Sequence, residues 1–334
     1  MKRYHIAIVG ATGMVGRTFC KVLQERKLDA DYTLFASARS AGSTVAFMGK
    51  DYVIQELTPT CFDGLDVDIA LFSAGGGTSQ TFAPIAAAAG AVVIDNSSCW
   101  RMDPDVPLVV PEVNADAIPG YKGKGIIANP NCSTIQAVVA LKPLHDAFGL
   151  KRVVYSTYQA VSGAGQAGYT DLEEGLKGVA PKKFPYPIAG NCIPHIDVFL
   201  DTGYTKEEQK MIEETQKIMG LPTLPVTATT VRVPVFHGHS ESINIEFERA
   251  FEMDQVFAAL RSFEGLVVED DTSANLYPLP LRAADTDPVY VGRIRRDFSV
   301  ANGINLWCVA DNIRKGAATN AVQIAEALIK YWEG

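Results

Sequence analysis

Residues Tyr4–Gly16 read YHIAIVGATGMVG, and this stretch decides the fold of the first part of the chain. Its first six residues form an apolar run that is typical of a buried strand. A glycine-rich turn follows, and a helical pattern over Met14–Arg26 begins directly within it. A strand, a glycine-rich turn and a helix in this order predict the first βα unit of a dinucleotide-binding domain.

The glycines of this turn are spaced GxxGxxG, at Gly10, Gly13 and Gly16, instead of in the usual GxGxxG pattern. Glycine allows a tight turn and lets a pyrophosphate approach the amides that open the next helix. A purely structural turn between strand and helix is the alternative. We expect a dinucleotide to be bound by residues of this turn: Gly10, Thr12, Gly13, Met14 and Val15.

The end of the expected second strand indicates which dinucleotide is bound. Residues Leu34–Ser40 read LFASARS, without the Asp or Glu that usually holds the ribose 2′-hydroxyl of NAD. Arg39 lies there instead, beside Ser37 and Ser40, and a guanidinium with two hydroxyl groups suits a 2′-phosphate. The pattern predicts NADP with Arg39 and Ser40 as ligands, and an exposed loop arginine is the alternative.

Strand-like and helix-like segments alternate through the first part of the chain, which predicts βαβ units and a mostly parallel sheet. Tyr4–Val9 is the first expected strand, and a second helical pattern occurs later, at Thr78–Ala89. We therefore expect an N-terminal Rossmann-type domain of the α/β class. The other expected strands of its sheet are Tyr32–Ala36, Asp68–Ser73, Ala91–Asp95 and Gly125–Ala128.

From about Ser133 the pattern becomes that of an α+β unit with a mixed or antiparallel sheet, whose free face would suit subunit packing. The expected strands are Arg152–Gln159, Thr227–Val235, Ser240–Glu248, Val289–Asp297 and Ile304–Ala310. The expected helices are one from about Ser133 to Phe148, one near Tyr169–Lys177 and one at Lys206–Met219.

These patterns divide the chain into two domains. We place an NADP-binding domain at residues 1–131 plus about 312–334, and a catalytic and dimerisation domain at residues 132–311. The long amphipathic pattern at Ala317–Trp332 is assigned to the first domain by analogy with known two-domain dehydrogenases.

The composition limits the class of protein. With 47% hydrophobic and 20% charged residues over 334 positions, the chain suits a soluble globular protein. Its 30 Lys and Arg against 38 Asp and Glu leave a formal net charge of -8, which argues against general nucleic-acid binding. The sequence shows neither a signal peptide nor the roughly 18 apolar residues of a membrane span. We expect a cytoplasmic protein that does not enter a membrane.

One of six scattered cysteines has a setting that favours chemistry. The six form no CxxC pair and no zinc-ligand spacing, which fits a reducing cytoplasm. Cys132, in the run Asn129–Thr134 (NPNCST), follows a short apolar strand and opens a helix. A helix N-terminus favours the thiolate form of a cysteine, so Cys132 is a candidate nucleophile. A small core residue behind an N-cap at Asn131 or Ser133 is the alternative.

Seven segments of the chain, in order and spacing, resemble one enzyme family, the aspartate-β-semialdehyde dehydrogenases of the bacterial type. The segments are GATGMVG, FASARSAG, NPNCSTIQ, TYQAVSGAG, EExKMxxET, RVPVFHGHSES and DNIRKGAA. The resemblance implies a phosphorylating enzyme that interconverts L-aspartate-4-semialdehyde, phosphate and NADP with L-4-aspartyl phosphate and NADPH. It further implies lysine (diaminopimelate), threonine and methionine biosynthesis and a homodimer or homotetramer.

The resemblance also implies roles for single residues. Cys132 matches the nucleophile that forms a thioester, and His239 matches the acid/base residue. An ordinary histidine pKa of about 6.5 suits proton transfer at neutral pH. Gln159, at the end of an expected strand, matches the side chain that orients the substrate and the intermediate by hydrogen bonding.

A semialdehyde of aspartate carries a carboxylate and an ammonium group as well as the aldehyde. By the resemblance, Arg232 would bind the carboxylate through a bidentate fork, and Glu207 would bind the ammonium, with the adjacent Glu208 as an alternative. Lys210, on the same helix face as Glu207, and Arg101 would bind phosphate. Taken singly, a charged helix is more often a solvated face and a strand arginine more often a cross-strand partner.

Three further residues would complete the cofactor site by family analogy: Ser162 and Gly163 in a glycine-rich turn, and Asn312 near the end of the second domain. A turn for its own sake is the alternative. His237 and His239, two residues apart on one expected strand, would point the same way. No third ligand has a suitable spacing, so we expect no metal.

Two other functions stay open. An enzyme like the N-acetyl-γ-glutamyl-phosphate reductases would act on an acylated substrate without an ammonium group, which would leave a glutamate partner without purpose. A non-catalytic protein that senses NADP is the other possibility, since a fold does not fix a function.

Overall fold

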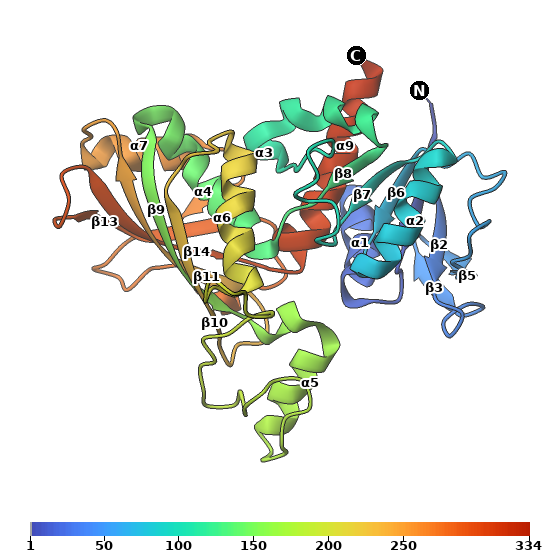
Figure 1. The fold of residues 1–334 in the computed structure, drawn as a ribbon, viewed down its shortest axis with the longest axis horizontal. Helices are drawn as coiled ribbons and strands as arrows, with labels where there is room; N and C mark the ends of the chain where they lie inside the picture. The colour runs from blue at the N-terminus through green and yellow to red at the C-terminus, as the bar shows by residue number, and fades with distance from the viewer. Residues whose placement is uncertain (1) are drawn as a thin grey trace. The chain divides into compact units, whose positions relative to one another are not determined.

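The computed structural model describes residues 2–334, which Figure 1 shows as a ribbon. Contacts divide the described chain into two compact units. The first unit runs to Pro130 and takes up the chain again at Ala317–Gly334. The second unit is Asn131–Gly316.

The first unit is built on a six-stranded sheet in which all neighbouring strands are parallel. This confirms the predicted Rossmann-type sheet, to which the structure adds the two-residue strand β5. In sheet order the strands are β5 (Gln55–Glu56), β2 (Ala30–Ala36), β1 (Tyr4–Val9), β6 (Ile69–Phe72), β7 (Val92–Asp95) and β8 (Ile126–Ala128). A separate antiparallel hairpin consists of β3 (Thr44–Phe47) and β4 (Lys50–Val53).

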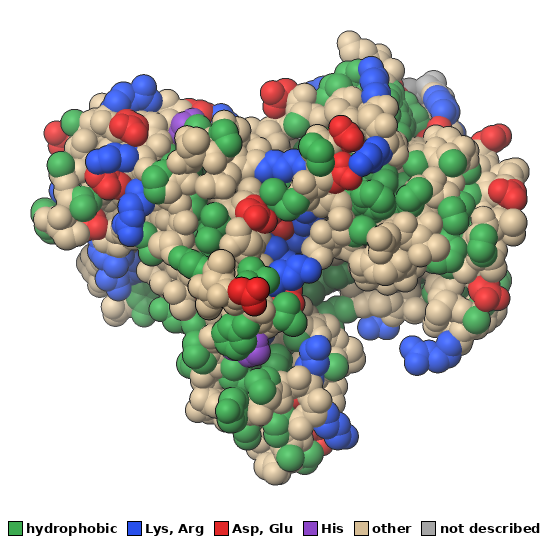
Figure 2. Space-filling model, in the orientation of Figure 1, with side chains coloured by type: hydrophobic (Ala, Val, Ile, Leu, Met, Phe, Trp, Pro, Cys, Tyr) green, Lys and Arg blue, Asp and Glu red, His purple; other side chains and the backbone are tan. Residues whose placement is uncertain are grey.

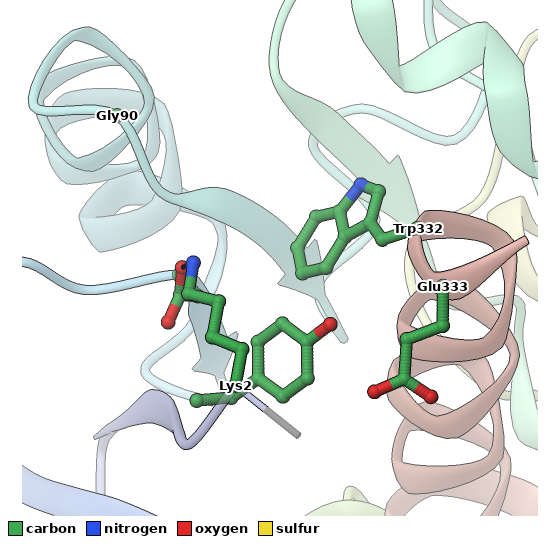
Figure 3. A pocket seen from close by; sticks show the side chains of 6 residues that line it. Lys2, Gly90, Trp332 and Glu333 are labelled. Carbon is green, nitrogen blue, oxygen red and sulfur yellow. Dashed lines mark hydrogen bonds and ion pairs between the residues drawn. The ribbon is translucent and has the colours of Figure 1, made fainter.

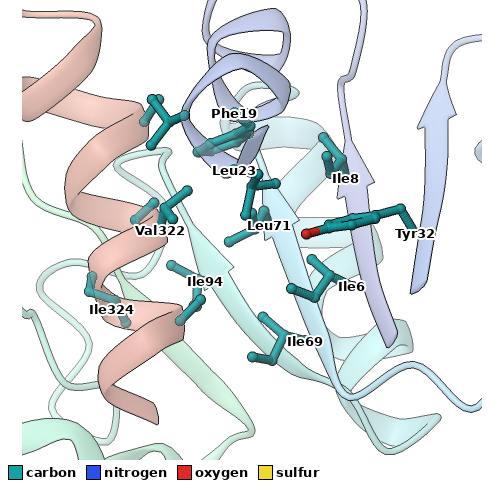
Figure 4. Close-up of a cluster of buried hydrophobic side chains, with 14 of the residues drawn as sticks. Ile6, Ile8, Phe19, Leu23, Tyr32, Ile69, Leu71, Ile94, Val322 and Ile324 are labelled. Carbon is teal, nitrogen blue, oxygen red and sulfur yellow. The ribbon is translucent and has the colours of Figure 1, made fainter. Parts of the chain in front are cut away.

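Helices bury both faces of this sheet. Ile69 and Leu71 of β6 belong to one apolar cluster with residues of α1 and α9, whereas Ala70 and Phe72 are buried outside that cluster. Figure 4 shows the cluster, with Val322 and Ile324 of α9 facing Ile94 and Leu71 of the sheet. The last helix therefore packs on the first sheet, as expected from known dehydrogenases. The helices of this unit are α1 (Met14–Arg26), α2 (Gly76–Ala88), α3 (Pro111–Asn114), the 3-10 helix η1 (Ala115–Gly123) and α9 (Thr319–Glu333).

The strand order places β1 at the point where the chain changes direction across the sheet. Its neighbours β2 and β6 lie on opposite sides of it. In open parallel sheets, ligands bind outside the carboxyl ends of the strands at such a point. The glycine-rich turn that begins at Gly10 follows the carboxyl end of β1.

The second unit is built on a mixed six-stranded sheet, which confirms the predicted class. The pairs β9–β10 and β12–β13 are parallel, and the others are antiparallel. The expected strand to Val235 ends at Arg232, two residues before Pro234, which has no N–H for a strand ladder. In sheet order the strands are β10 (Val226–Arg232), β9 (Leu150–Gln159), β11 (His239–Phe247), β14 (Gly303–Ala310), β13 (Val289–Asp297) and β12 (Leu266–Val268).

The helix α4 (Cys132–Phe148) covers the middle of this sheet, where it contacts β9, β11, β13 and β14. Its apolar residues are buried around most of its circumference, because α6 and α7 pack on it as well. The other helices of this unit are α5 (Gly165–Gly175), α6 (Lys206–Met219), α7 (Met253–Ser262) and α8 (Pro280–Ala283). Two short irregular helices are the 3-10 helix η2 (Val161–Ala164) and the π-helix η3 (Arg314–Ala318).

The other face of this sheet is less covered. Along β9 the side chains that alternate with the buried ones are half-buried or exposed, ending with Tyr158. Tyr158 packs on Trp307 of β14, with ring centroids 5.4 Å apart. Figure 2 shows hydrophobic side chains at the bottom of the view, where Figure 1 draws α5. The exposed hydrophobic side chains of the second unit include Leu176, Tyr186 and Phe199.

Candidate active site

The glycines at the end of β1 are required by close backbone packing. Gly10 has a φ of 87°, and a Cβ atom on it would lie 2.3 Å from the carbonyl oxygen of Ser73. A Cβ atom on Gly16 would lie 2.1 Å from the carbonyl oxygen of Gly10. Only glycine therefore lets α1 begin so close to the turn and lets the turn pass the end of β6.

The turn after β2 meets this glycine-rich turn. The hydroxyl of Thr12 donates to the hydroxyl of Ser40 at 3.4 Å, which brings two of the expected cofactor ligands together. Arg39 is exposed beside them.

A second glycine run at the same edge of the sheet was not recognised in the sequence, although its signal, Gly75-Gly76-Gly77, is plain. It follows β6 and opens α2, and Gly75 has a φ of 86°. A Cβ atom on any of the three would meet nothing within 4 Å in the described chain. These glycines are therefore not explained by packing, and their backbone is open at the carboxyl end of β6.

Asn131 organises the start of α4, directly before Cys132. Its side-chain oxygen accepts hydrogen bonds from the N–H groups of Ser133 and Thr134, so it is the N-cap of the helix. Its own N–H donates to Glu214 at 2.6 Å, and its side-chain amide donates to Glu207 at 2.9 Å. Asn131 thus fixes the first turn of α4 and joins it to two acids of α6. Neither Asn131 as a site residue nor Glu214 was expected from the sequence.

Cys132 is the first residue of α4 and is partly accessible. The other cysteines have ordinary settings: burial raises the pKa of Cys20 to about 11 and raises the pKa of Cys308 well above its usual range. Burial also raises the pKa of Cys61 and Cys99.

Glu207 and Glu208 are neighbours with different surroundings. Glu208 forms a capping box with Thr205 and also accepts from the N–H of Thr230, so backbone groups occupy its carboxylate. Glu207 instead accepts from the side-chain amides of Asn131, at 2.9 Å, and Gln159, at 3.2 Å. The geometry therefore groups Glu207, and not Glu208, with the other candidate site residues.

Lys210 keeps Glu207 charged. Its ammonium group lies 3.1 Å from Glu207 and 2.8 Å from Asp197. Burial alone would raise the pKa of Glu207, but the charge of Lys210 and the hydrogen bonds from Asn131 and Gln159 hold this pKa below its ordinary value. The site thus contains a buried, ionised carboxylate next to a lysine.

Arg232 closes another side of this group, at the end of β10. Its guanidinium donates to the carbonyl oxygen of Ala160 at 2.7 Å and lies over the ring of Phe184. In the described chain its Nε has no hydrogen-bond partner, although Arg232 is only 5% exposed. An arginine with one arm fixed and another nitrogen unpaired in a buried place is suited to bind an anion.

His239 is completely buried at the start of β11. Its Nδ1 accepts a hydrogen bond from the N–H of Ala160 at 3.0 Å. Burial, together with the charge of Arg232, holds the pKa of His239 well below its ordinary value. A Cβ atom on Gly163 would lie 3.1 Å from Nε2 of His239 and 2.9 Å from a terminal nitrogen of Arg232. His239 and Arg232 therefore pack closely on the backbone of Gly163, where a side chain would not fit.

Ser162 and Asn312, two of the expected cofactor residues, bond to each other at 3.1 Å. Asn312 also accepts from the N–H of Gly238 at 3.0 Å. Asn312 thus ties the turn that carries Gly163 to the loop before His239. His237, in contrast, lies outside β11 with its ring against Tyr169.

Arg101 belongs to the first unit, where it is buried after β7. Its guanidinium donates to the carbonyl oxygens of Asn129 and Asn96, each at 3.0 Å. It therefore joins the loops that follow β8 and β7. The other expected substrate and phosphate residues belong to the second unit.

Gln136 and Glu241 lie behind the site and were not expected from the sequence. Gln136, one turn after Cys132 in α4, donates to the carbonyl oxygen of His239 at 3.3 Å. Glu241 is completely buried, and neither of its carboxyl oxygens has a hydrogen-bond partner within residues 2–334. Gln136 links the helix of the cysteine to the strand of the histidine.

The open pocket in Figure 3 is not part of this site. It is lined by Lys2 and Tyr4 at the amino end of β1 and by Trp332 and Glu333 of α9. The glycine-rich turn follows the opposite, carboxyl end of β1.

Among residues 2–334, no helix combines the length and the apolar character that crossing a membrane requires.

Family models match both units of the chain. The model of the semialdehyde dehydrogenase NAD binding domain matches residues 5–121, and that of the semialdehyde dehydrogenase dimerisation domain matches residues 141–315. The aspartate-semialdehyde dehydrogenase of Aquifex aeolicus is 56% identical to the chain, with 98% of each covered. The chain belongs to the aspartate-semialdehyde dehydrogenase family.

Solved structures agree with this membership. Aspartate semialdehyde dehydrogenase II from Vibrio cholerae, complexed with ASA, is 50% identical and has a TM-score of 0.95, with 99% of each chain covered. The aspartate semialdehyde dehydrogenase with NADP from Candida albicans is 28% identical and has a TM-score of 0.77, with 98% of each chain covered. The resemblance seen in the sequence is confirmed, and the chain is an oxidoreductase with an NAD(P)-binding domain.

Proposed function

We propose that this member of the aspartate-semialdehyde dehydrogenase family interconverts L-aspartate-4-semialdehyde, phosphate and NADP with L-4-aspartyl phosphate and NADPH. The observation that carries the proposal is the group around Cys132: the carboxylate of Glu207, bound by Asn131 and Gln159, and the unpaired Nε of Arg232 among the described residues. A carboxylate and a guanidinium in one buried place match the two charges of an amino acid.

The charge on Glu207 supports an amino-acid substrate over an acylated one. A buried carboxylate is costly unless a cation or hydrogen bonds stabilise it. Glu207 is kept ionised by Lys210, Asn131 and Gln159, and an ammonium group would add a further favourable charge. An N-acetyl group carries no such charge, so an N-acetyl-γ-glutamyl-phosphate reductase would gain nothing from Glu207.

Cys132 is the proposed nucleophile. Its thiolate attacks the acyl carbon, phosphate leaves, and the acyl group stays on the enzyme as a thioester. Arg232 supports this step, because its charge interacts with that of Cys132. Gln159 holds the acyl group by hydrogen bonding, and Lys210 and Arg101 bind the phosphate. His239, the residue assigned to acid/base chemistry by the resemblance, acts at the reacting carbonyl group.

The dinucleotide would supply the redox chemistry of the reaction, in which NADPH is the hydride donor and NADP the hydride acceptor. The turn residues Gly10, Thr12, Gly13, Met14 and Val15 would hold its pyrophosphate, with Arg39 and Ser40 at the 2′-phosphate. Two observations fit a dinucleotide here: the Thr12–Ser40 contact and the open glycines that start α2. On the second unit, Ser162, Gly163 and Asn312 would contact the nicotinamide part.

A second copy of the chain is the proposed partner, as a homodimer or a dimer of dimers, through the second unit. The sheet face that carries Tyr158 and the match to a dimerisation domain support this. The biosynthesis of lysine, threonine and methionine in the cytoplasm is the proposed setting, because aspartyl phosphate is an activated form of an amino acid.

The test is NADP reduction by aspartate semialdehyde, measured with and without phosphate. Turnover should require phosphate and should vanish in Cys132→Ala, while NADP binding and the unfolding transition stay unchanged. Cys192→Ala, at an exposed cysteine, is the matched control and should keep full activity. Near-normal turnover in Cys132→Ala would overturn the mechanism, and better turnover of the N-acetylglutamate semialdehyde would overturn the substrate. A binding-only protein would show NADP binding without any phosphate-dependent turnover.

A further inference from the structure

The segment between β9 and α6, residues 161–205, is attached to the end of β10. The backbone groups of Ile193 and Arg232 exchange two hydrogen bonds, at 2.8 and 2.9 Å. Phe184 packs on the small apolar cluster that contains Ile193 and Leu172. The segment therefore brings an aromatic side chain to the arginine that is proposed to bind the substrate.

Asp171 of α5 fixes the part of this segment that carries Phe184. Its carboxylate accepts hydrogen bonds from three successive backbone N–H groups, those of Lys182 at 2.9 Å, Lys183 at 2.7 Å and Phe184 at 2.9 Å. Burial alone would raise the pKa of Asp171, but the three amides hold this pKa below its ordinary value. The backbone at position 184 is therefore held by an ionised carboxylate.

The ring of Phe184 lies between α5 and the guanidinium of Arg232. The carbon atom of the guanidinium is 5.9 Å from the ring centroid, within the range of a cation–π interaction. A Cβ atom on Gly168 of α5 would lie 3.1 Å from Cζ of the ring. The ring is therefore confined between Gly168 and Arg232.

Two contacts fix the guanidinium of Arg232. Its Nη1 donates to the carbonyl oxygen of Ala160 at 2.7 Å, and the ring of Phe184 covers one face. Its Nε has no hydrogen-bond partner among the described residues. Nε belongs to the side edge of the guanidinium, and two parallel N–H groups on such an edge match a carboxylate. A carboxylate on that edge lies in the plane of the guanidinium, away from the face that the ring occupies.

We propose that Phe184 and Asp171 are positioning residues for the carboxylate of the substrate, Phe184 acting through Arg232 and Asp171 acting through Phe184. The proposal rests on the proposed function, in which Arg232 binds that carboxylate. An arginine side chain that is already held in one conformation loses less entropy when an anion binds. The ring also keeps water from one face of the cation, which strengthens its attraction for an anion. The affinity for the substrate thus depends on a ring that makes no bond to it.

Phe184→Leu tests the ring, because leucine keeps an apolar side chain on the cluster but has no π face. A buried cation–π contact changes an equilibrium constant about 5- to 30-fold, so the KM for aspartate semialdehyde should rise by that factor. The kcat should stay nearly unchanged, since the carboxylate is bound equally before and during the reaction. The KM for phosphate is an internal control, and Tyr186→Ala, at an exposed aromatic residue, is the matched variant that should keep both KM values. An unchanged KM for the semialdehyde in Phe184→Leu would overturn the role of the ring.

Asp171→Asn tests the anchor. Asparagine has nearly the same shape, but it carries no charge and offers one oxygen to the three amides. We expect the KM for aspartate semialdehyde to rise in this variant as well, with kcat nearly unchanged. A lower free energy of unfolding with an unchanged KM would show that Asp171 only stabilises the fold.

The position of Arg232 can also be determined without turnover, from crystal structures of wild type and Phe184→Leu. We expect one conformer of Arg232 in wild type and a rotated side chain or two conformers in the variant. The same single conformer in both would contradict the positioning role. Absence of phosphate-dependent turnover in the wild-type enzyme would instead overturn the proposed function, and the two crystal structures would still decide whether Phe184 positions Arg232.

Discussion

Gly316 lies directly against Cys132. A Cβ atom on Gly316 would be 2.9 Å from the Cβ of Cys132 and 3.3 Å from its Cα. Gly316 belongs to the π-helix Arg314–Ala318, and π-helical turns often occur at functional sites. The absence of a side chain at position 316 is therefore a condition for the position of the proposed nucleophile.

Gly316→Ala should lower kcat about 100-fold, because a shift of the nucleophile by about 1 Å is enough for such a loss. The rate of alkylation of Cys132 by iodoacetamide should change with it, since the new methyl group displaces the thiol. The control is Gly120→Ala, where the nearest atom would be 3.4 Å away. Unchanged kcat and alkylation in Gly316→Ala would show that the contact does not position Cys132.

Arg39→Ala tests the choice of dinucleotide. A charge-assisted hydrogen bond to a phosphate contributes about 1.5–3 kcal/mol, so the Kd for NADP should rise about 10- to 100-fold. The Kd for NAD, which has no 2′-phosphate, should stay within a factor of two or three of wild type, on the order of the change expected for a surface substitution. Isothermal titration with both dinucleotides measures this, with the exposed Lys50→Ala as control. An equal loss of affinity for both would mean that Arg39 does not read the 2′-phosphate.

Glu241→Gln tests a buried proton. Burial, together with the charge of Glu207, holds the pKa of Glu241 well above its usual value of 4.5. The folded state thus keeps a proton that the unfolded chain loses above that pH. The stabilising contribution is complete below pH 4.5 and is lost as the pH rises toward the folded-state pKa, by at most about 1.4 kcal/mol per pH unit.

A glutamine at position 241 has no such proton to keep. Relative to wild type, Glu241→Gln should therefore become more stable with rising pH between 5 and 8 in urea unfolding. The control is Glu248→Gln, at an exposed position. Parallel curves of stability against pH for wild type and Glu241→Gln would show that Glu241 is ionised in the folded protein.

Thr205→Ala and Glu208→Ala test whether Thr205 and Glu208 stabilise the start of α6 and take no part in turnover. Loss of an N-cap costs about 1 kcal/mol, and Glu208→Ala should cost more than Thr205→Ala because Glu208 also accepts from the N–H of Thr230. Urea unfolding measures both, and kcat of the folded protein should be kept. For Glu207→Gln we expect the opposite result. The loss of kcat should be large, and the change in the free energy of unfolding should be small. If Glu208→Ala lost turnover while keeping its stability, Glu208 would be the substrate ligand.

Much of the fold could be predicted from the sequence because its periodicities are clear. The apolar runs of β1, β6 and β7 are buried in a parallel sheet, and the alternating run of β9 lies in a mixed one. The helix α7 was missed, since Met253–Ser262 is short and has its caps in Glu252 and Gln255 and not in a Ser, Thr or Asp. The strand β5 was missed because two residues form no pattern.

The site could be predicted only where a residue type suggests its chemistry. Glu207 and Glu208 are equal in the sequence, and their roles separate only because Thr205 and Thr230 occupy one of them. Asn131 was seen as a cap, but its bonds to Glu207 and Glu214 depend on α6, about 80 residues later. The ring of His239 accepts a hydrogen bond from the amide of Ala160, which follows β9, and no local pattern indicates that.

If two copies associate through the uncovered face of the second sheet, as proposed, the stability of this chain depends on its concentration. A single copy in dilute solution leaves Tyr158, Leu176 and Phe199 in contact with water. Association with a second copy removes such surface from water and stabilises the folded state by mass action. The melting temperature should therefore depend on the protein concentration as well as on the sequence, and dilution should lower it.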